Sequence, residues 1–205
     1  MSDPVIDGCG WAAGDPLMLT YHDEEWGVPV WDDDALFERL MLECFQAGLS
    51  WRTILHRRDS FHRAFDGWNA ETIARYGPDD HARLLADPGI IRNRLKVEGA
   101  SKNARAFLQL RDETGSFAGY LWSFTGGDVL DRPAPIGREH VPATTPESDA
   151  LSKALKKRGF TFVGSTIVYA FMQSAGLVND HLETCPARER CLALAAERRN
   201  ATVSR

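Results

Sequence analysis

Apolar residues recur along most of the chain at intervals of three and four positions, which is the spacing of an amphipathic helix. The clearest stripe includes Leu36, Leu40 and Ala47, and it follows the aspartates 32–34, which can cap the start of a helix. Gly48 can end that helix, because glycine readily adopts the left-handed conformation common at helix C-termini. The pattern therefore predicts a helix between these aspartates and this glycine.

Capping residues and glycines divide much of the remaining chain into further predicted helices. The longest runs from about Arg94 to Thr114 and is stopped by Gly115. The others are a helix capped by Ser50 that continues through Leu55, helices at 70–76 and 79–86, one opened by Thr145 with Pro146 that ends at Gly159, and one from Ser165 to Gly176. The stretch 126–146 is rich in proline and glycine and is predicted to be a long loop. No repeated alternation of valine and isoleucine supports a sheet, so the predicted fold class is all-α.

The length of 205 residues and the 43% share of hydrophobic residues predict one compact unit with a substantial core. The N-terminus lacks a basic region followed by an apolar run, and no stretch approaches about 20 apolar residues, so neither a signal peptide nor a membrane partner is predicted. We therefore expect a cytoplasmic protein with reduced thiols. The net charge of −5 argues against broad, non-specific nucleic-acid binding, although a local basic face is compatible with it.

Two cysteine–histidine pairs lie near opposite ends of the chain, Cys9 with His22 and His181 with Cys185. Four positions separate His181 from Cys185, so on a helical turn the two would share one face. Two thiolates and two imidazoles form the tetrahedral donor set that zinc prefers, and four protein ligands make such a site structural. The alternatives are buried cysteines with scattered histidines, because no Cys-x2-Cys pair is present, or a disulfide, although nothing in the sequence indicates export.

A carboxylate interrupts the apolar stripe of the first predicted helix at Glu43. A carboxylate that faces inward loses its hydration and needs a partner. One interpretation is a salt bridge to Arg39 or Arg52, and the other is a binding site for a cationic or amine-bearing ligand. Aromatic residues of the same N-terminal region favour a pocket for a flat, electron-poor ring, although such residues are also common in cores. They are Trp11, Tyr21, Trp26 and Trp51.

Residues 84–96 join two predicted helices through a tight turn that contains Gly89, which is the layout of a helix-hairpin-helix. The backbone N–H groups of such a turn can hold a DNA phosphate without reading sequence. Taken alone, the segment is equally an ordinary connection between two helices. Basic residues gather at 92–105 and 153–158, but charge runs are usually solvated helix faces.

Several long motifs together resemble the 3-methyladenine DNA glycosylase I family, and the resemblance covers the chain from about Cys9 to Cys185. The motifs are CGW (9–11), YHDEEWGVP (21–29), LFERLMLECFQAGLSW (36–51), GIIRNR (89–94), NARAF (103–107), LWSF (121–124), SDALSKALKKRGFTFVG (148–164) and FMQSAGLVNDH (171–181). The resemblance implies an all-α helix-hairpin-helix DNA glycosylase fold, a single unit over 1–205. Its implied parts are terminal segments 1–31 and 177–191 stapled by zinc, a helical region 32–125 with the hairpin 84–96, a loop 126–146, a helical pair 147–176 and a tail 192–205.

The same resemblance implies the function and the site. The implied enzyme is a monomeric bacterial hydrolase that flips N3-methylated adenine out of double-stranded alkylated DNA, hydrolyses the N-glycosidic bond without lyase activity and releases free 3-methyladenine. It places a structural Zn²⁺ on Cys9, His22, His181 and Cys185, and leaves Cys44 and Cys191 as non-ligands, with Cys191 the first substitute. It assigns base recognition to Glu43 and the pocket aromatics to Tyr21 and Trp51, with Trp11 and Trp26 lining the same region and Met18 at a pocket position, and it places the family hairpin on residues 89–94. From this we expect Glu43 to be catalytic, Tyr21 and Trp51 to sandwich the base, and DNA to be bound by Gly89, Ile91, Arg92, Arg94 and Lys96. Leu49, an apolar tip just after Gly48, is our candidate for the wedge that fills the gap in the duplex.

The chain departs from the family pattern at a few positions. Met18 stands where many relatives have a tyrosine, and Ala170 where some have a small hydroxyl residue. The catalytic aspartate of most helix-hairpin-helix glycosylases has no clear counterpart, and the nearest acid, Asp112, is predicted to lie on the surface. Methylation at N3 makes adenine cationic and weakens its bond to the sugar, so a strong acid is not required. The enzyme mainly extracts the nucleotide and holds it for attack by water, and undamaged adenine, which lacks the charge, is rejected.

Two other functions are compatible with these features. A non-catalytic module would bind alkylated bases tightly without releasing them, and a zinc-stapled scaffold would use Glu43 and the aromatic residues only as core. A nuclease or lyase is disfavoured, because no cluster of metal-binding carboxylates and no lysine placed to form a Schiff base is evident. Phosphate-loop, GxSxG and HExxH motifs are also absent from the sequence.

Overall fold

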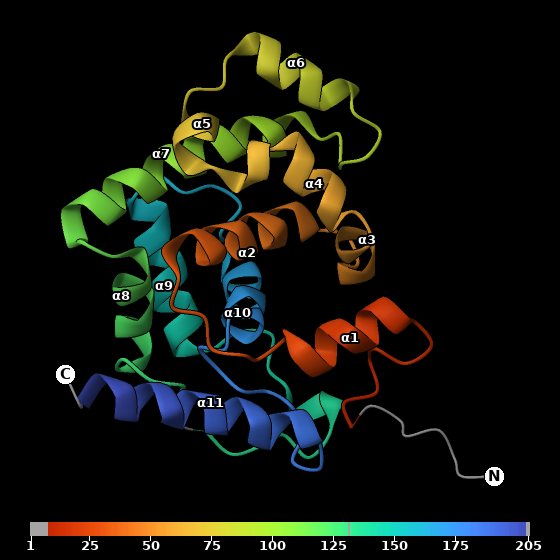
Figure 1. Cartoon of the computed structure of the whole chain (residues 1–205), viewed down its shortest axis with the longest axis vertical. Coiled ribbons are helices and arrows are strands. Elements are labelled where there is room, and N and C mark those ends of the chain that lie inside the picture. The colour runs from red at the N-terminus through yellow and green to blue at the C-terminus, as the bar shows by residue number, and fades with distance from the viewer. Residues whose placement is uncertain (1–7, 131, 204–205) are drawn as a thin grey trace.

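The computed structural model describes residues 8–130 and 132–203, and its regular elements are helices (Figure 1). Within these ranges, β pairing is limited to one isolated bridge between Leu130 and Val178. No helix in the described part of the chain is long and apolar enough to cross a membrane. The predicted all-α class is confirmed. The first seven residues of the predicted segment 1–31 and the last two of the predicted tail 192–205 lie outside the described residues.

The described residues contain eleven α-helices and three short 3-10 turns, joined by loops. The α-helices are α1 (Pro16–Glu24), α2 (Asp33–Gln46), α3 (Trp51–Leu55), α4 (Arg58–Ala64), α5 (Ala70–Ala74), α6 (Pro78–Ala86), α7 (Arg94–Thr114), α8 (Phe117–Trp122), α9 (Pro146–Lys157), α10 (Ser165–Ser174) and α11 (Pro186–Val203). The 3-10 turns are η1 (Asp66–Trp68), η2 (Ser123–Thr125) and η3 (Arg138–His140). The helices predicted from stripes and caps are present, with most boundaries within two residues.

Side-chain caps explain why the predicted boundaries hold. The carboxylate of Asp32 accepts a hydrogen bond from the backbone N–H of Ala35 at 2.9 Å and starts α2. The next residue, Asp33, serves a distant helix, because its carboxylate accepts the N–H groups of Phe117 and Ala118 at 3.0 and 2.8 Å. The starts of α2 and α8 are therefore tied together, which fixes the direction of the central helix.

Helices α1, α4, α8 and α11 were not predicted as such. The inward face of α1 contains Met18, Tyr21 and His22, so a polar residue interrupts its short apolar stripe. The helix nevertheless starts at a clear signal, since the carboxylate of Asp15 accepts the N–H groups of Leu17 and Met18. The C-terminal tail, for which the sequence leaves open a helix or disorder, is helical as far as residue 203, because α11 extends from residue 186 to residue 203.

Helix α2 lies in the middle of the molecule and packs against α3, α7, α8 and α10 (Figure 1). Its stripe residues Leu36, Leu40 and Phe45 have no solvent exposure and belong to the main core. At the lower edge of the view, α1 contacts α11, so segments from opposite ends of the sequence lie together. This contact brings the two cysteine–histidine pairs into one place and leaves α1 facing α2 and α3.

Candidate active site and metal cluster

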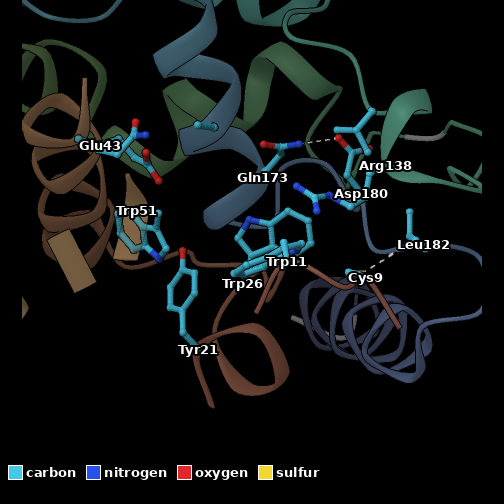
Figure 2. A pocket seen from close by; sticks show the side chains of 13 residues that line it. Cys9, Trp11, Tyr21, Trp26, Glu43, Trp51, Arg138, Gln173, Asp180 and Leu182 are labelled. Atoms are coloured by element: carbon cyan, nitrogen blue, oxygen red, sulfur yellow. Dashed lines mark hydrogen bonds between the residues drawn. The ribbon is translucent and has the colours of Figure 1, made fainter. Parts of the chain in front are cut away.

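A cavity of about 370 Å³ lies where α1, α2, α3 and α10 meet the loop that carries η3 (Figure 2). Its size is within the range of pockets that enclose small ligands. Five of the predicted pocket residues line it: Trp11, Tyr21, Trp26, Glu43 and Trp51. The fold therefore assembles in space a set of side chains that the sequence spreads over 41 positions.

The aromatic side chains form one continuous wall of this cavity. The ring centroids of Trp11 and Trp26 are 5.3 Å apart with planes inclined by 76°, and Trp11 also meets Tyr21 edge-on at 6.3 Å. Tyr21 and Trp51 lie 5.0 Å apart and are tilted by 41°. A base placed between two rings needs about 7 Å between them, twice the usual contact distance. In this arrangement a flat ligand would stack on the cavity face of the wall, and the predicted sandwich between Tyr21 and Trp51, which stays a prediction, would require the two rings to move apart.

Met18 is not among the residues that line the cavity. It is buried in a small apolar cluster with Ala12, Tyr21 and Leu55, one helical turn before the tyrosine. The prediction that Met18 binds the base is thus corrected, since its thioether packs with Tyr21 in this cluster and supports the aromatic wall. Ala170, the other departure from the family pattern, does line the cavity.

Glu43 is a buried carboxyl group on the same side of the cavity as Trp51 and Tyr21, with only 4% of its surface exposed (Figure 2). Burial raises its pKa to about 8, against smaller lowering effects of the Ser174 hydroxyl and of Arg39. The predicted alternative, an internal salt bridge, is not seen among the described residues. Arg39 donates hydrogen bonds to the carbonyls of Glu25 and Ser174, and Arg52 pairs with Asp15 at 3.2 Å. Glu43 therefore faces the cavity as a largely protonated acid at neutral pH.

The four predicted metal ligands are together and buried. The donor atoms of Cys9, His22, His181 and Cys185 all lie within 4.8 Å of one another. The Sγ of Cys185 is 3.5 Å from Nδ1 of His181 and 3.6 Å from Nε2 of His22, and Sγ of Cys9 is 3.6 Å from the same Nδ1. A tetrahedron with zinc bonds of about 2.3 Å to sulfur and about 2.1 Å to nitrogen has sulfur–nitrogen edges of about 3.6 Å. The donor set thus has the spacing of a four-coordinate metal site.

The outer nitrogens of both imidazoles have hydrogen-bond acceptors. Nδ1 of His22 is 2.7 Å from the carboxylate of Asp23, and Nε2 of His181 is 2.9 Å from the carbonyl of Trp26. A proton on each outer nitrogen leaves the inner nitrogen with a free lone pair for a metal, as is usual for metal-binding histidines. Burial lowers the pKa of His181 to about 4, which keeps the ring neutral.

Two details of the metal prediction are decided by the structure. His181 and Cys185 do not share a helical face, because they lie in a turn that precedes α11. The turn is held by the N–H of Cys185, which donates to the carbonyl of Leu182 at 2.9 Å. Cys44 and Cys191 lie outside the cluster of described metal donors, as predicted.

The predicted DNA hairpin exists as a turn between α6 and α7, but two of its proposed contacts are wrong. Lys96 is buried, and its Nζ donates to the carbonyls of Phe45 and Ala47 at 2.8 and 2.6 Å, where it caps the C-terminus of α2. The N–H of Gly89 is also occupied, since it donates to the carboxylate of Asp87 at 2.7 Å. Neither group is available to a phosphate.

The remaining predicted DNA contacts keep some exposure. Arg92 and Arg94 are exposed, and Ile91 is half-buried against the core. Leu49 is 39% exposed on the turn between α2 and α3, next to the cavity residue Trp51. Leu49, Arg92 and Arg94 therefore form a discontinuous set of exposed side chains near the α2–α3 and α6–α7 turns.

Sequence reasoning missed the far end of the cavity. Asp180 is buried there, and it accepts hydrogen bonds from the hydroxyl of Tyr169 and from Nε2 of Gln173, the latter at 2.9 Å. Arg138 and Val141 of the long loop line the same end. The polar Asn179-Asp180 pair after an apolar run was the one available signal, because loop residues have no periodicity from which their direction can be predicted.

Comparison with known proteins gives consistent matches over most of the chain. The family model described as methyladenine glycosylase matches residues 11–189. DNA-3-methyladenine glycosylase 1 of Escherichia coli (strain K12) is 47% identical over 180 residues, which cover 88% of this chain and 96% of the relative. DNA-3-methyladenine glycosylase of Haemophilus influenzae is 44% identical over 88% of this chain and 97% of the relative. A solved structure from Staphylococcus aureus, described as the structural basis of 3-methyladenine recognition by 3-methyladenine DNA glycosylase I, is similar with a TM-score of 0.86 and 34% identity, covering 90% of this chain and 98% of that one.

Proposed function

This chain belongs to the methyladenine glycosylase family, and we propose that it removes 3-methyladenine from alkylated DNA by hydrolysing the N-glycosidic bond. The observation that carries the proposal is the pairing of a buried carboxyl group, Glu43, with a wall of electron-rich aromatic rings in one cavity. An electron-poor ring with a positive charge is attracted by both features, whereas a neutral ring gains less from either. The methylated base is such a ring.

Selection against undamaged adenine follows from the state of Glu43. With a pKa of about 8 the empty cavity holds this group mostly protonated at pH 7. A cationic base makes the ionised carboxylate favourable, and ionising Glu43 at this pH costs only on the order of 1 kcal/mol. A neutral adenine offers no such compensation. We propose that Glu43 is the residue that recognises the charge of the lesion and accepts hydrogen bonds from it.

The chemical step needs little acid–base assistance. The methylated base departs as a neutral molecule, so its departure requires no proton from the protein. Asp112, the nearest downstream acid to the hairpin, is exposed on α7, which supports a mechanism without the usual catalytic aspartate. The protein contributes extraction of the nucleotide, orientation against the aromatic wall and exclusion of undamaged bases.

We propose that the cluster of Cys9, His22, His181 and Cys185 holds a structural zinc ion. The donor types and their spacing support this assignment, and the acceptors behind both histidines support it further. Bound zinc would supply a cross-link between α1 and the turn before α11. Four protein ligands leave no open coordination position, so the cross-link acts on stability and on the placement of Trp26, whose carbonyl accepts from His181.

We propose that the partner is double-stranded alkylated DNA, bound by the single unit 1–205 as a monomer. Leu49 is the candidate for the apolar wedge that fills the space left by the flipped nucleotide. Arg92, Arg94 and the backbone at Ile91 are the candidates for phosphate contacts from the α6–α7 turn. Their exposure supports these roles.

The proposed function is tested by measuring base release from methylated duplex DNA, with products separated by chromatography. The native protein is expected to release free 3-methyladenine, and Glu43→Gln is expected to release it at least about 100-fold more slowly, because a neutral amide cannot stabilise the cationic base. Glu38→Gln is the matched control, since Glu38 lies on the same helix but does not line this cavity.

Each other outcome of this experiment would indicate a different function for the chain or for Glu43. Tight binding of the damaged duplex without base release by folded native protein would indicate a lesion-binding module. Full activity of Glu43→Gln would remove Glu43 from the site. If Glu43→Gln altered the stability of the protein but not its activity, the buried carboxyl group would have a role in the core only.

A further inference from the structure

The cavity extends beyond the space in which Glu43 and the aromatic wall would hold a base. Figure 2 shows Glu43, Trp51 and Tyr21 on one side and Arg138 on the other, with the two indoles Trp11 and Trp26 between them. The guanidinium of Arg138 points from the η3 loop into this space. One end of the cavity is therefore built around a carboxyl group and the other around a cation.

Arg138 does not suit the base itself. It is the one lysine or arginine among the described residues that line the cavity, and none of the ion pairs in the described part of the chain includes it. A fixed positive charge repels a cationic ring, so its complement must be the anionic part of the nucleotide. We propose that Arg138 binds the DNA phosphate next to the flipped nucleotide, an inference that rests on the proposed glycosylase function.

The loop that carries Arg138 is fastened to the rest of the fold. The carbonyl of Pro135 accepts the N–H of Glu183 at 2.9 Å, and the N–H of Leu130 donates to the carbonyl of Leu177 at 2.9 Å. Val141, on the other side of η3, packs against the main core. These attachments before and after η3 hold the backbone at Arg138 beside the cavity, and the exposed side chain can reach an anion there.

The nearest buried acid is already engaged by other groups. Asp180 accepts from Tyr169 and Gln173, and its second oxygen lies 3.6 Å from Nη1 of Arg132. Arg132 therefore balances the charge of Asp180 at this end of the cavity. Arg138 remains as a positive charge at the mouth, where the backbone of a duplex must pass to deliver a nucleotide.

A phosphate contact is distinguishable from a general charge effect by neutralising single phosphates. The substrate is a duplex with a tetrahydrofuran abasic analogue, in which each phosphate within two positions of the analogue is replaced in turn by an uncharged methylphosphonate. The proteins are the native chain, Arg138→Ala, Arg138→Lys and Arg75→Ala. Arg75 is the matched control, because it is exposed at the end of α5 and does not line the cavity.

We expect Arg138→Ala to weaken binding of the unmodified duplex by about tenfold and to lower the slope of log affinity against log salt by about 1. At one methylphosphonate position the native protein should lose the same factor, and Arg138→Ala should lose nothing more. Arg138→Lys should keep the salt slope, Arg75→Ala should bind like the native protein, and affinity for free 3-methyladenine should not change in any of them.

Additive losses at every methylphosphonate position, or equal effects of Arg138→Ala and Arg75→Ala, would overturn the phosphate assignment. Weaker binding of free 3-methyladenine by Arg138→Ala would overturn it as well, because the residue would then act on the base. Failure of the proposed function gives a different result, namely no base release by the native chain from methylated DNA, whatever the variants do.

Discussion

The metal cluster and the Glu43 wall of the cavity are both buried polar sites in an otherwise apolar interior. In the cluster, each histidine has an acceptor behind it, and the four donor atoms lie at the spacing that one metal ion requires. At Glu43 the neighbouring arginines are engaged elsewhere, and burial raises the pKa of the carboxyl group to about 8. The first site is complementary to a single metal ion that its four ligands would enclose, whereas the second faces a cavity that a ligand can enter.

This difference separates a structural role from a functional one. A set of buried donors that encloses one metal ion stabilises the folded state when the ion is bound. The carboxyl group of Glu43 has the Ser174 hydroxyl as a partner but no paired cation, so its ionisation in the fold is unfavourable until a cationic ligand arrives. The two sites are also connected, because the carbonyl of Trp26 accepts from His181 while its indole lines the cavity. The metal cluster thus holds in place part of the wall of the cavity.

The largest expected effect comes from removing a ligand or the ion of the metal cluster. Cys185→Ser, or removal of the metal by a chelator, should lower the free energy of unfolding by about 3–5 kcal/mol and the Tm by roughly 10 °C. Calorimetry together with metal analysis measures both quantities. Cys191→Ala is the control, since Cys191 is buried beside the cluster without belonging to it, and it should keep the metal. An unchanged Tm after verified loss of metal would contradict the staple.

The next effect concerns Glu43 and has the opposite sign. Burial raises the pKa of Glu43 from its ordinary value of 4.5 to about 8, so the folded protein binds this proton more tightly than the unfolded chain does. The free energy of unfolding therefore falls as the pH rises from about 4.5 to about 8. Glu43→Gln removes this loss, so its stability advantage over the native protein should grow by about 3–4 kcal/mol between pH 5 and pH 8.

Denaturant unfolding at the two pH values measures this difference. Glu38→Gln serves again as the control on the same helix. Equal pH dependence in the native protein and in Glu43→Gln would show that the carboxyl group has a satisfactory partner in the fold, and the comparison between the two sites would then fail.

The smallest expected effects distinguish the roles of Lys96 and Arg92, two basic residues that lie close together in the sequence. Lys96→Met should lower stability by about 1–2 kcal/mol, because two carbonyls at the end of α2 lose their donor, and it should leave the salt dependence of DNA binding unchanged. Arg92→Ala should leave stability within about 0.5 kcal/mol and weaken DNA binding several-fold for all sequences. A reduced salt slope in Lys96→Met would return this lysine to the DNA contacts.

Much of the fold was accessible from the sequence wherever the signals are local. The α2 and α7 helices follow from their caps, their apolar stripes and their terminating glycines, all of which act within a few residues. Glu43 stood out as a polar residue on an apolar stripe, and the structure confirms that it is buried beside the aromatic residues of the N-terminal region. The residue types suggested the grouping of Cys9, His22, His181 and Cys185, and the family motifs favoured it over the alternatives that spacing alone left open.

The failures share one physical cause. The direction of a side chain in a turn or loop, and the partner that it finds, depend on what packs against it from distant parts of the chain. Lys96 was expected in solvent because its neighbours are basic, but the end of α2 supplies two unpaired carbonyls at that place. The sequence did not predict that Arg138 lines the cavity, because a loop has no repeating pattern from which the direction of a side chain follows. The hydrogen bonds of this loop to residues 177 and 183 bring Arg138 to the cavity.

The sequence by itself determined the helices, the all-α class and the inward carboxyl group, because caps, periodicity and desolvation are properties of short stretches. The tertiary structure alone decided that Tyr21 and Trp51 touch each other, that Met18 does not line the cavity, and that the cavity ends in a cation. These features depend on distances between helices, which arise from the packing of the whole core and have no local signal in the chain.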